Sequence, residues 1–186
     1  MSDSEIMTEG YALSELHKRI ITALLVVVVA GALLLSGGYI FILGILVMAA
    51  LMDKEWHNIS PENSIGWKVL GILYITLPCM AALALRDLSL TAILYPITLV
   101  IATDIGAYFS GRTIGGPKIA PSISPNKTWA GLVGGAIAAL CLSLLIYSYV
   151  PYPETALGAA IVALIIAPLA QLGDFFESWL KRQKGV

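Results

Sequence analysis

The residues of this chain that could do chemistry gather in two polar stretches of an otherwise apolar sequence. The first begins at Asp104, which lies inside an apolar run, where a carboxylate costs at least ~2.5 kcal/mol unless it is paired, hydrated or bound to a cation. At helical spacing Asp104 shares one face with Tyr108, Gly111 and Arg112. This stripe predicts either a functional site or an Asp104–Arg112 ion pair that helps two helices pack. We favour the site, because intramembrane carboxylates usually mark one.

The loop after this stripe has the groups that hold a polyphosphate. Its sequence, GRTIGGPKIAPSISPNKTWAG, combines glycines, serine hydroxyls such as that of Ser124, and cations at Arg112, Lys118 and Lys127. The P-loop spacing Gly-x-x-x-x-Gly-Lys-[Ser/Thr] is absent, and prolines stiffen the chain instead. An ordinary charged loop that attracts anionic lipid headgroups fits this composition equally well.

The second polar stretch is the C-terminal QLGDFFESWLKRQKGV. On a helix, one face carries a set of polar and charged residues: Gln171, Asp174, Ser178, Lys181 and, beside them, Arg182. The carboxylates of Asp174 and Glu177 suit a hard cation such as Mg²⁺, and Lys181 and Arg182 suit phosphate oxygens. The alternative is a basic cap at the membrane surface, in which Glu177 and Lys181 form a simple i,i+4 pair.

Membrane helices must position both stretches. The 186 residues are 58% hydrophobic and 12% charged, with a mean hydropathy of +0.86, which is typical of a polytopic membrane protein. We expect an all-α protein that forms a single membrane-embedded domain over residues 1–186. Its helices, each near the ~20 residues that cross a bilayer, are predicted near 16–35, 39–56, 69–85, 88–111, 130–149 and 155–172. Gly131 and Gly135 form a GxxxG pair, which we interpret as helix packing.

The distribution of charge predicts the orientation of these six helices. With six spans, ten of the eleven Lys and Arg residues lie on one side of the membrane. The tail 1–15, the loop 112–129 and the C-terminal segment 171–186 are therefore expected in the cytoplasm. The net charge of -1 gives no overall basic character, so we expect no nucleic-acid partner.

The chain resembles the phosphatidate cytidylyltransferases, also called CDP-diacylglycerol synthases. The matching residues are Glu15-Leu16-His17-Lys18-Arg19, Glu55-Trp56, the block 103–135 and the segment GDFFESWLKR. The family's C-terminal signature begins Ser-x-(apolar)-Lys-Arg, followed by four arbitrary residues and Lys-Asp. Residues 178–182 match this beginning and residues 183–186 fill the arbitrary positions. We therefore expect an inactive fragment that ends inside the signature.

The resemblance implies an integral protein of the bacterial cytoplasmic membrane, with its active face in the cytoplasm, that converts CTP and phosphatidate to CDP-diacylglycerol and pyrophosphate. It implies Mg²⁺ as the cofactor, because two polyanions must meet. Membrane lipid is a further expected partner, and homo-oligomerisation is left open. By matched position, the metal ligands are Asp174 and Asp104. The catalytic residues are Asp174, Lys181 and Arg182. The substrate-binding residues are Lys127, Ser124, Ser178, Arg112 and Lys118.

Three other functions fit parts of the sequence. A small transporter or channel would use Asp104 to line a path, although a conduit needs polar groups through the depth of the membrane and here they cluster at one face. A lipid or polyprenol kinase would also bind a nucleotide at this face. A non-catalytic subunit would need a partner to supply further carboxylates.

Overall fold

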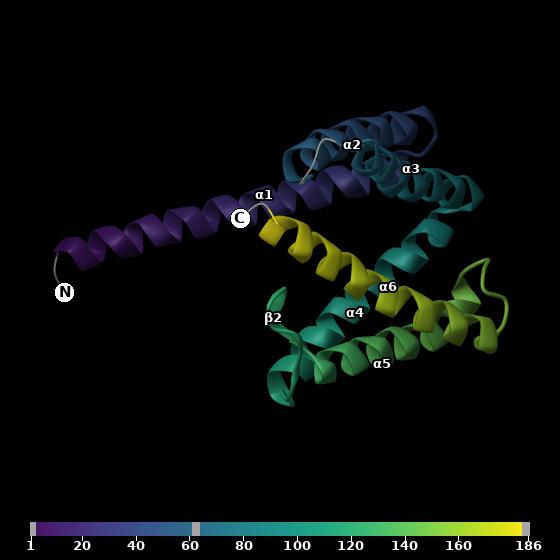
Figure 1. The fold of residues 1–186 in the computed structure, drawn as a ribbon. Helices are drawn as coiled ribbons and strands as arrows, with labels where there is room; N and C mark the ends of the chain where they lie inside the picture. Colours follow the sequence, from purple (N-terminus) through teal and green to yellow (C-terminus); the bar gives the residue numbers. More distant parts are fainter. Residues whose placement is uncertain (1–2, 61–63, 184–186) are drawn as a thin grey trace. The chain divides into compact units, whose positions relative to one another are not determined.

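The computed structural model describes residues 3–60 and 64–183 and is built almost entirely of helices (Figure 1). The elements of this described chain are α1 (Asp3–Ser36), α2 (Gly38–Ile59), α3 (Ile65–Leu88), α4 (Leu90–Thr113), β1 (Lys118–Ala120), β2 (Ser124–Thr128), α5 (Trp129–Ile146), the 3-10 helix η1 (Tyr147–Tyr149) and α6 (Ala156–Gln183). The helices confirm the predicted all-α class. The contacts divide the chain into two compact units, Met1–Gly44 and Ile45–Val186, and the single domain expected from the sequence stays a prediction.

Five helical segments in the described part of the chain are long and apolar enough to cross a membrane. They are His17–Ser36, Ile65–Leu88, Leu90–Thr113, Trp129–Tyr149 and Ala156–Gln183. Helix α2 is not among them, because every 18-residue stretch of its 22 residues contains Asp53, Lys54 and Glu55. The protein is an integral membrane protein, while the sixth span and the cytoplasmic position of both termini stay predictions.

In the first unit, a glycine turn joins α1 to α2. Gly37 and Gly38 have φ angles of 62° and 50°, a left-handed conformation that a side chain would strain. After the turn, Gly44 lies against Leu33, and a Cβ built on Gly44 would be 2.8 Å from Leu33 Cδ1. The missing side chain therefore lets the two helices close on each other.

In the second unit, the main core lies where α4, α5 and α6 pack together (Figure 1). Leu99 of α4, Ala139 of α5 and Ala163 of α6 are fully buried there. Ser143 of α5 links the three helices: its hydroxyl donates to Ala159 O of α6 at 2.7 Å, and Tyr95 Oη of α4 is 2.6 Å away. Because Ser143 gives its proton to the carbonyl, Tyr95 is the donor in the second bond.

Helices α4 and α5 approach each other through glycines. A Cβ built on Gly135 would lie 2.8 Å from Thr103 O, and one on Gly131 would lie 3.0 Å from Ala107 O. On α4, a Cβ on Gly106 would lie 2.5 Å from the Cβ of Ala138. Backbones this close are typical of membrane helix pairs, which confirms the packing interpretation of the Gly131–Gly135 pair.

A second core joins α2, α3 and α6. Trp56, Ile75 and Leu180 are buried in it. The indole N–H of Trp56 donates to Trp67 O at 3.1 Å. Helix α6 reaches this core because it continues to Gln183, eleven residues past the predicted end of its span at residue 172.

The predicted loop 112–129 contains a β-hairpin. Gly115 and Gly116, with φ angles of 66° and 95°, turn the chain after α4. Strands β1 and β2 then pair antiparallel, with Lys118 opposite Thr128. The Thr128 hydroxyl accepts a hydrogen bond from Gly131 N at 3.1 Å and so caps α5. The hairpin therefore delivers β2 directly to the N-terminus of α5.

Candidate functional site

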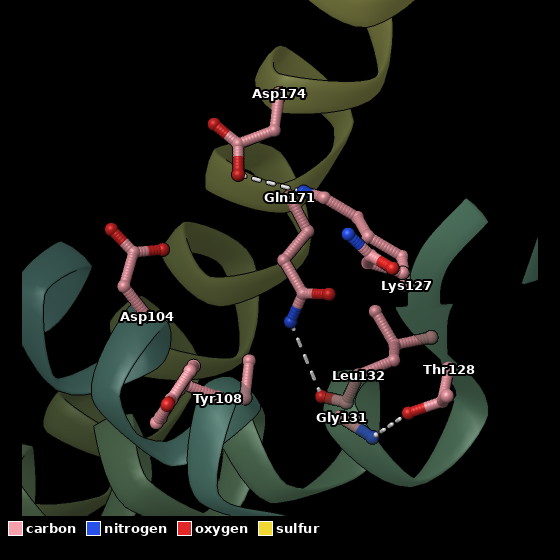
Figure 2. Close-up of a pocket in the computed structure, with 10 residues that line it drawn as sticks. Asp104, Tyr108, Lys127, Thr128, Gly131, Leu132, Gln171 and Asp174 are labelled. Carbon is pink, nitrogen blue, oxygen red and sulfur yellow. Dashed lines mark hydrogen bonds and ion pairs between the residues drawn. The ribbon is translucent and has the colours of Figure 1, made fainter. Parts of the chain in front are cut away.

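An open cavity of about 200 Å³ is lined by the hairpin, α4, α5 and α6 (Figure 2). Three of the site residues predicted from the sequence line it: Asp104 from α4, Lys127 from β2 and Asp174 from α6. The other lining residues are Ala107, Tyr108, Asn126, Thr128, Gly131, Leu132 and Gln171. Two carboxylates and one ammonium from three separate elements thus face the same space.

Lys127 and Asp174 form an ion pair in this cavity. Lys127 Nζ lies 2.6 Å from Asp174 Oδ2, and it also lies 4.9 Å from the centre of the Phe175 ring. The Lys127 side chain is 23% exposed and that of Asp174 is 55% exposed. The lysine is therefore held against α6, but the pair is open enough for a metal ion or a phosphate to compete for either partner.

Asp104 faces the same cavity from α4, whereas Asp174 faces it from α6 (Figure 2). Its carboxylate is close enough to Asp174 and Lys127 to interact electrostatically with both. Among the described residues, no ion pair joins Asp104 to Arg112, whose guanidinium donates to Tyr108 Oη at 3.0 Å. The geometry therefore supports the site interpretation of Asp104 over the ion pair that was its alternative.

Gln171 and Thr128 are buried polar residues of the cavity lining. Gln171 is only 5% exposed, and its amide nitrogen donates to Leu132 O at 3.4 Å, which ties α6 to the first turn of α5 (Figure 2). Thr128 is buried and engaged as the cap of α5. Because both polar groups are satisfied inside the protein, they fix the positions of the helices that carry the charged residues.

Sequence reasoning left four polar lining residues out of the candidate site: Tyr108, Asn126, Thr128 and Gln171. Tyr108 and Gln171 share helix faces with Asp104 and Asp174, so helical spacing was the signal that could have included them. Asn126 precedes Lys127 in β2, and only the hairpin brings it to the cavity.

The other predicted site residues do not line this cavity: Ser124, Ser178, Lys181, Arg182, Arg112 and Lys118. Lys181 Nζ lies 2.5 Å from Glu177 Oε1, which is the i,i+4 pair that the sequence offered as the alternative. The Nε of Arg182 donates to Ile123 O at 2.5 Å, so Arg182 ties the end of α6 to the hairpin that carries Lys127.

Asp104 and Asp174 are the residues that fit a magnesium ion. Mg²⁺ is bound in enzymes by one or two carboxylates together with substrate phosphates and water, and two carboxylates face this cavity. Among the described residues, no group of three or more His, Cys, Asp and Glu side chains is gathered to hold a metal. These two carboxylates therefore fit an ion whose other ligands come from the substrate and water, and not an ion bound by protein side chains alone.

Comparison with known proteins identifies similar chains. A family model described as the cytidylyltransferase family matches residues 63–186. A phosphatidate cytidylyltransferase of Brucella suis is 40% identical over 164 residues, which cover 85% of this chain and 58% of the relative. One of Rickettsia bellii is 30% identical over 179 residues, covering 91% and 77%, and one of Bacillus subtilis is 35% identical over 132 residues, covering 69% and 49%.

No solved structure matches the chain significantly. The chain spans a little over half the length of the Brucella relatives that it matches. The family model covers the hairpin and helices α4, α5 and α6, and therefore the whole lining of the cavity described above. The resemblance found in the sequence is confirmed, and this chain belongs to the cytidylyltransferase family.

Proposed function

We propose that this protein is a phosphatidate cytidylyltransferase, which transfers the cytidylyl group of CTP to phosphatidate. The observation that carries this proposal is the convergence of Asp104, Lys127 and Asp174 in one open cavity. The relatives that bear this enzyme's name add independent support. The cavity would hold the phosphates of CTP.

The proposed reaction joins two polyanions. A phosphate oxygen of phosphatidate attacks the α-phosphorus of CTP, the bond between the α-phosphorus and the bridging oxygen breaks, and pyrophosphate leaves with that oxygen. CDP-diacylglycerol is the other product, and no covalent enzyme intermediate is required. Catalysis then depends on positioning the two substrates and neutralising their charge.

The charged residues of the cavity have distinct roles in this proposal. Asp104 and Asp174 would hold Mg²⁺, which when bound supplies the positive charge that phosphate oxygens need. Lys127 would leave its ion pair with Asp174 and donate to a phosphate oxygen. Arg182 would position the hairpin, because its guanidinium is bonded to Ile123 O.

The remaining predicted residues have weaker support from their positions. Lys181 would reach phosphate only after leaving Glu177, and Ser178 lies one helical turn beyond Asp174 on α6. Ser124 begins β2, and Lys118 and Arg112 lie on β1 and at the end of α4. We propose them as contacts to the outer phosphates or to the lipid phosphate.

The membrane setting constrains how phosphatidate enters. Its acyl chains cannot leave the bilayer cheaply, at ~0.8 kcal/mol per CH₂, so the lipid must reach the cavity from the side. We propose that the cavity lies at the cytoplasmic face of the bacterial inner membrane, where CTP is available. The clustering of Lys and Arg on one side of the predicted spans supports this orientation.

The position of a radioactive label tests the reaction class. The purified chain is incubated with Mg²⁺, phosphatidate, the hydroxyl lipids diacylglycerol and polyprenol, and CTP labelled at either the α- or the γ-phosphate, and label in chloroform-soluble lipid is counted. A cytidylyltransferase places only the α-label in the lipid, whereas a lipid kinase places only the γ-label there. Equilibrium dialysis with CTP and ATP is run in parallel, and we expect CTP to bind more tightly. Lipid labelled from the γ-phosphate, or tighter binding of ATP, would contradict the proposal. With no label in the lipid, tighter binding of CTP than of ATP is the result that the proposal requires.

A further inference from the structure

A second cavity, of about 260 Å³, lies further along α6 and is separate from the first. It is lined by the Glu55-Trp56 pair of α2, by Tyr74 of α3, and by Glu177 and Lys181 of α6. Glu55 and Trp56 carry part of the family resemblance, yet the proposed reaction gives neither of them a role. The cavity therefore needs its own explanation.

The aromatic wall of this cavity is held rigidly. Trp56 is 5% exposed, and its indole N–H is bonded to Trp67 O. Its ring centre lies 5.5 Å from that of Tyr74 and 6.4 Å from that of Phe176. Gly71 leaves room for this indole, because a Cβ on Gly71 would clash with the ring. Tyr74, which is 41% exposed, is the ring of this wall that a cation can reach.

The charges around the wall favour a cation as well. Lys181 is paired with Glu177. Glu55 forms no ion pair among the described residues, although it is close enough to Lys181 to interact with it. Two carboxylates against one ammonium leave an excess of one negative charge in the cavity, next to the aromatic faces. Such a cavity repels an anionic lipid and attracts a positively charged headgroup.

The apolar part of the cavity indicates that this headgroup belongs to a lipid. Met52, Ile75 and Leu180 complete the lining. The cavity also borders α3 and α6, two helices long and apolar enough to span the membrane. Acyl chains could therefore remain in the bilayer while the headgroup enters between the helices. A soluble amine would leave this apolar surface exposed to water.

We propose that this cavity binds the headgroup of an ethanolamine phospholipid. The primary ammonium group would donate to Glu55 and lie against Tyr74, while the lipid phosphate would accept from Lys181. A trimethylammonium headgroup has no N–H to donate to Glu55 and fits the carboxylate less well. Asp104 and Asp174 do not line this cavity, and Lys181 is the residue that it shares with the contacts proposed for the reaction, so lipid binding is measured apart from turnover.

Tryptophan fluorescence can test this site directly. Three of the four tryptophans, Trp56, Trp67 and Trp179, belong to the cluster around the cavity. The purified chain in detergent is titrated with short-chain phosphatidylethanolamine, phosphatidylcholine and phosphatidylglycerol, and with free phosphoethanolamine. Native mass spectrometry counts the bound lipid. We expect saturable binding of phosphatidylethanolamine, with phosphatidylcholine, phosphatidylglycerol and the free headgroup each weaker by about tenfold.

Three variants decide whether binding occurs in this cavity. Glu55→Gln removes one charge and keeps the shape, so it should weaken phosphatidylethanolamine binding by about tenfold. Glu154→Gln is the matched control, because Glu154 is an exposed residue outside this cavity. Asp174→Asn should leave lipid binding unchanged, which separates this cavity from the proposed metal site.

Each contrary result would overturn the inference. Equal binding of phosphatidylcholine would remove the role of the ammonium N–H groups, and tighter binding of phosphatidylglycerol would reverse the charge argument. Equal binding of free phosphoethanolamine would show that the ligand is not a lipid. Unchanged binding by a folded Glu55→Gln variant would place the lipid elsewhere. If Glu55→Gln failed to fold, Tyr74→Leu would be the second test, and its unchanged binding would count equally against the site.

Discussion

Asp174→Asn should change CTP binding in opposite directions with and without Mg²⁺. The substitution removes one charge from the cavity and keeps the size of the side chain. In the wild-type chain this charge engages Lys127, at 2.6 Å. The asparagine would release that lysine for a phosphate, but it would also remove one of the two carboxylates proposed to hold the metal.

The expected magnitudes follow from the exposure of the pair. With Lys127 23% and Asp174 55% exposed, the ion pair is worth about 0.2–1 kcal/mol. Its loss should tighten metal-free CTP binding by about 1.4- to 5-fold. With Mg²⁺ present, the loss of a metal ligand should outweigh the release of Lys127. Even removing a residue that only supports a metal ligand lowers metal affinity by about 10- to 100-fold. We therefore expect CTP binding to weaken by more than about 10-fold at a Mg²⁺ concentration that saturates the wild type.

Equilibrium dialysis with radiolabelled CTP measures the affinity without metal, in EDTA, and with metal, in excess Mg²⁺. Asp87→Asn is the matched control, because it makes the same change at an exposed residue near the end of α3, outside the cavity. Circular dichroism and size exclusion establish that each variant is folded. A folded Asp174→Asn chain whose CTP binding still tightens normally with Mg²⁺ would refute the metal role. Weaker metal-free binding would refute the view that Asp174 competes with phosphate for Lys127.

Three further predictions concern the fold. Ser143→Ala should lower the free energy of unfolding by about 1 kcal/mol in denaturant titrations. Adding Tyr95→Phe should lower it little further, because the two hydroxyls belong to one hydrogen-bond network. Fully additive losses in the double variant would contradict this. Gly106→Leu should separate α4 from α5 and abolish CTP binding, whereas a folded, binding-competent variant would disprove the close contact. In a chain without native cysteines, a cysteine at Asp87 should be labelled from outside the cell and one at Ser122 should not; the reverse would overturn the predicted orientation.

The membrane helices and the polar stripes could be predicted from the sequence. Apolar runs of sufficient length indicate spanning helices, because the bilayer fixes the length that a helix needs. Five such segments are present in the residues that the structure describes, and the charges at Asp53, Lys54 and Glu55 set α2 apart from them. Helical spacing also placed Asp104 and Asp174 on polar helix faces. This could be predicted because a helix face is defined by residues three and four apart in the sequence. The family resemblance followed from short matching segments and is confirmed by the comparisons.

Only the tertiary structure decided which of the candidate charges share a cavity. Lys127 pairs with Asp174 because the hairpin places β2 beside α6, whereas Lys181, on the same helix as Asp174, turns to Glu177 and the second cavity. The sequence could offer the i,i+4 pair of Lys181 with Glu177, but it has no acidic residue near Lys127 and so could not indicate a partner for that lysine. The partner of Lys127 is decided by two contacts of the hairpin: Thr128 caps α5, and Arg182 at the end of α6 donates to Ile123 O. Those are long-range packing choices, and local patterns of charge and hydropathy do not encode them.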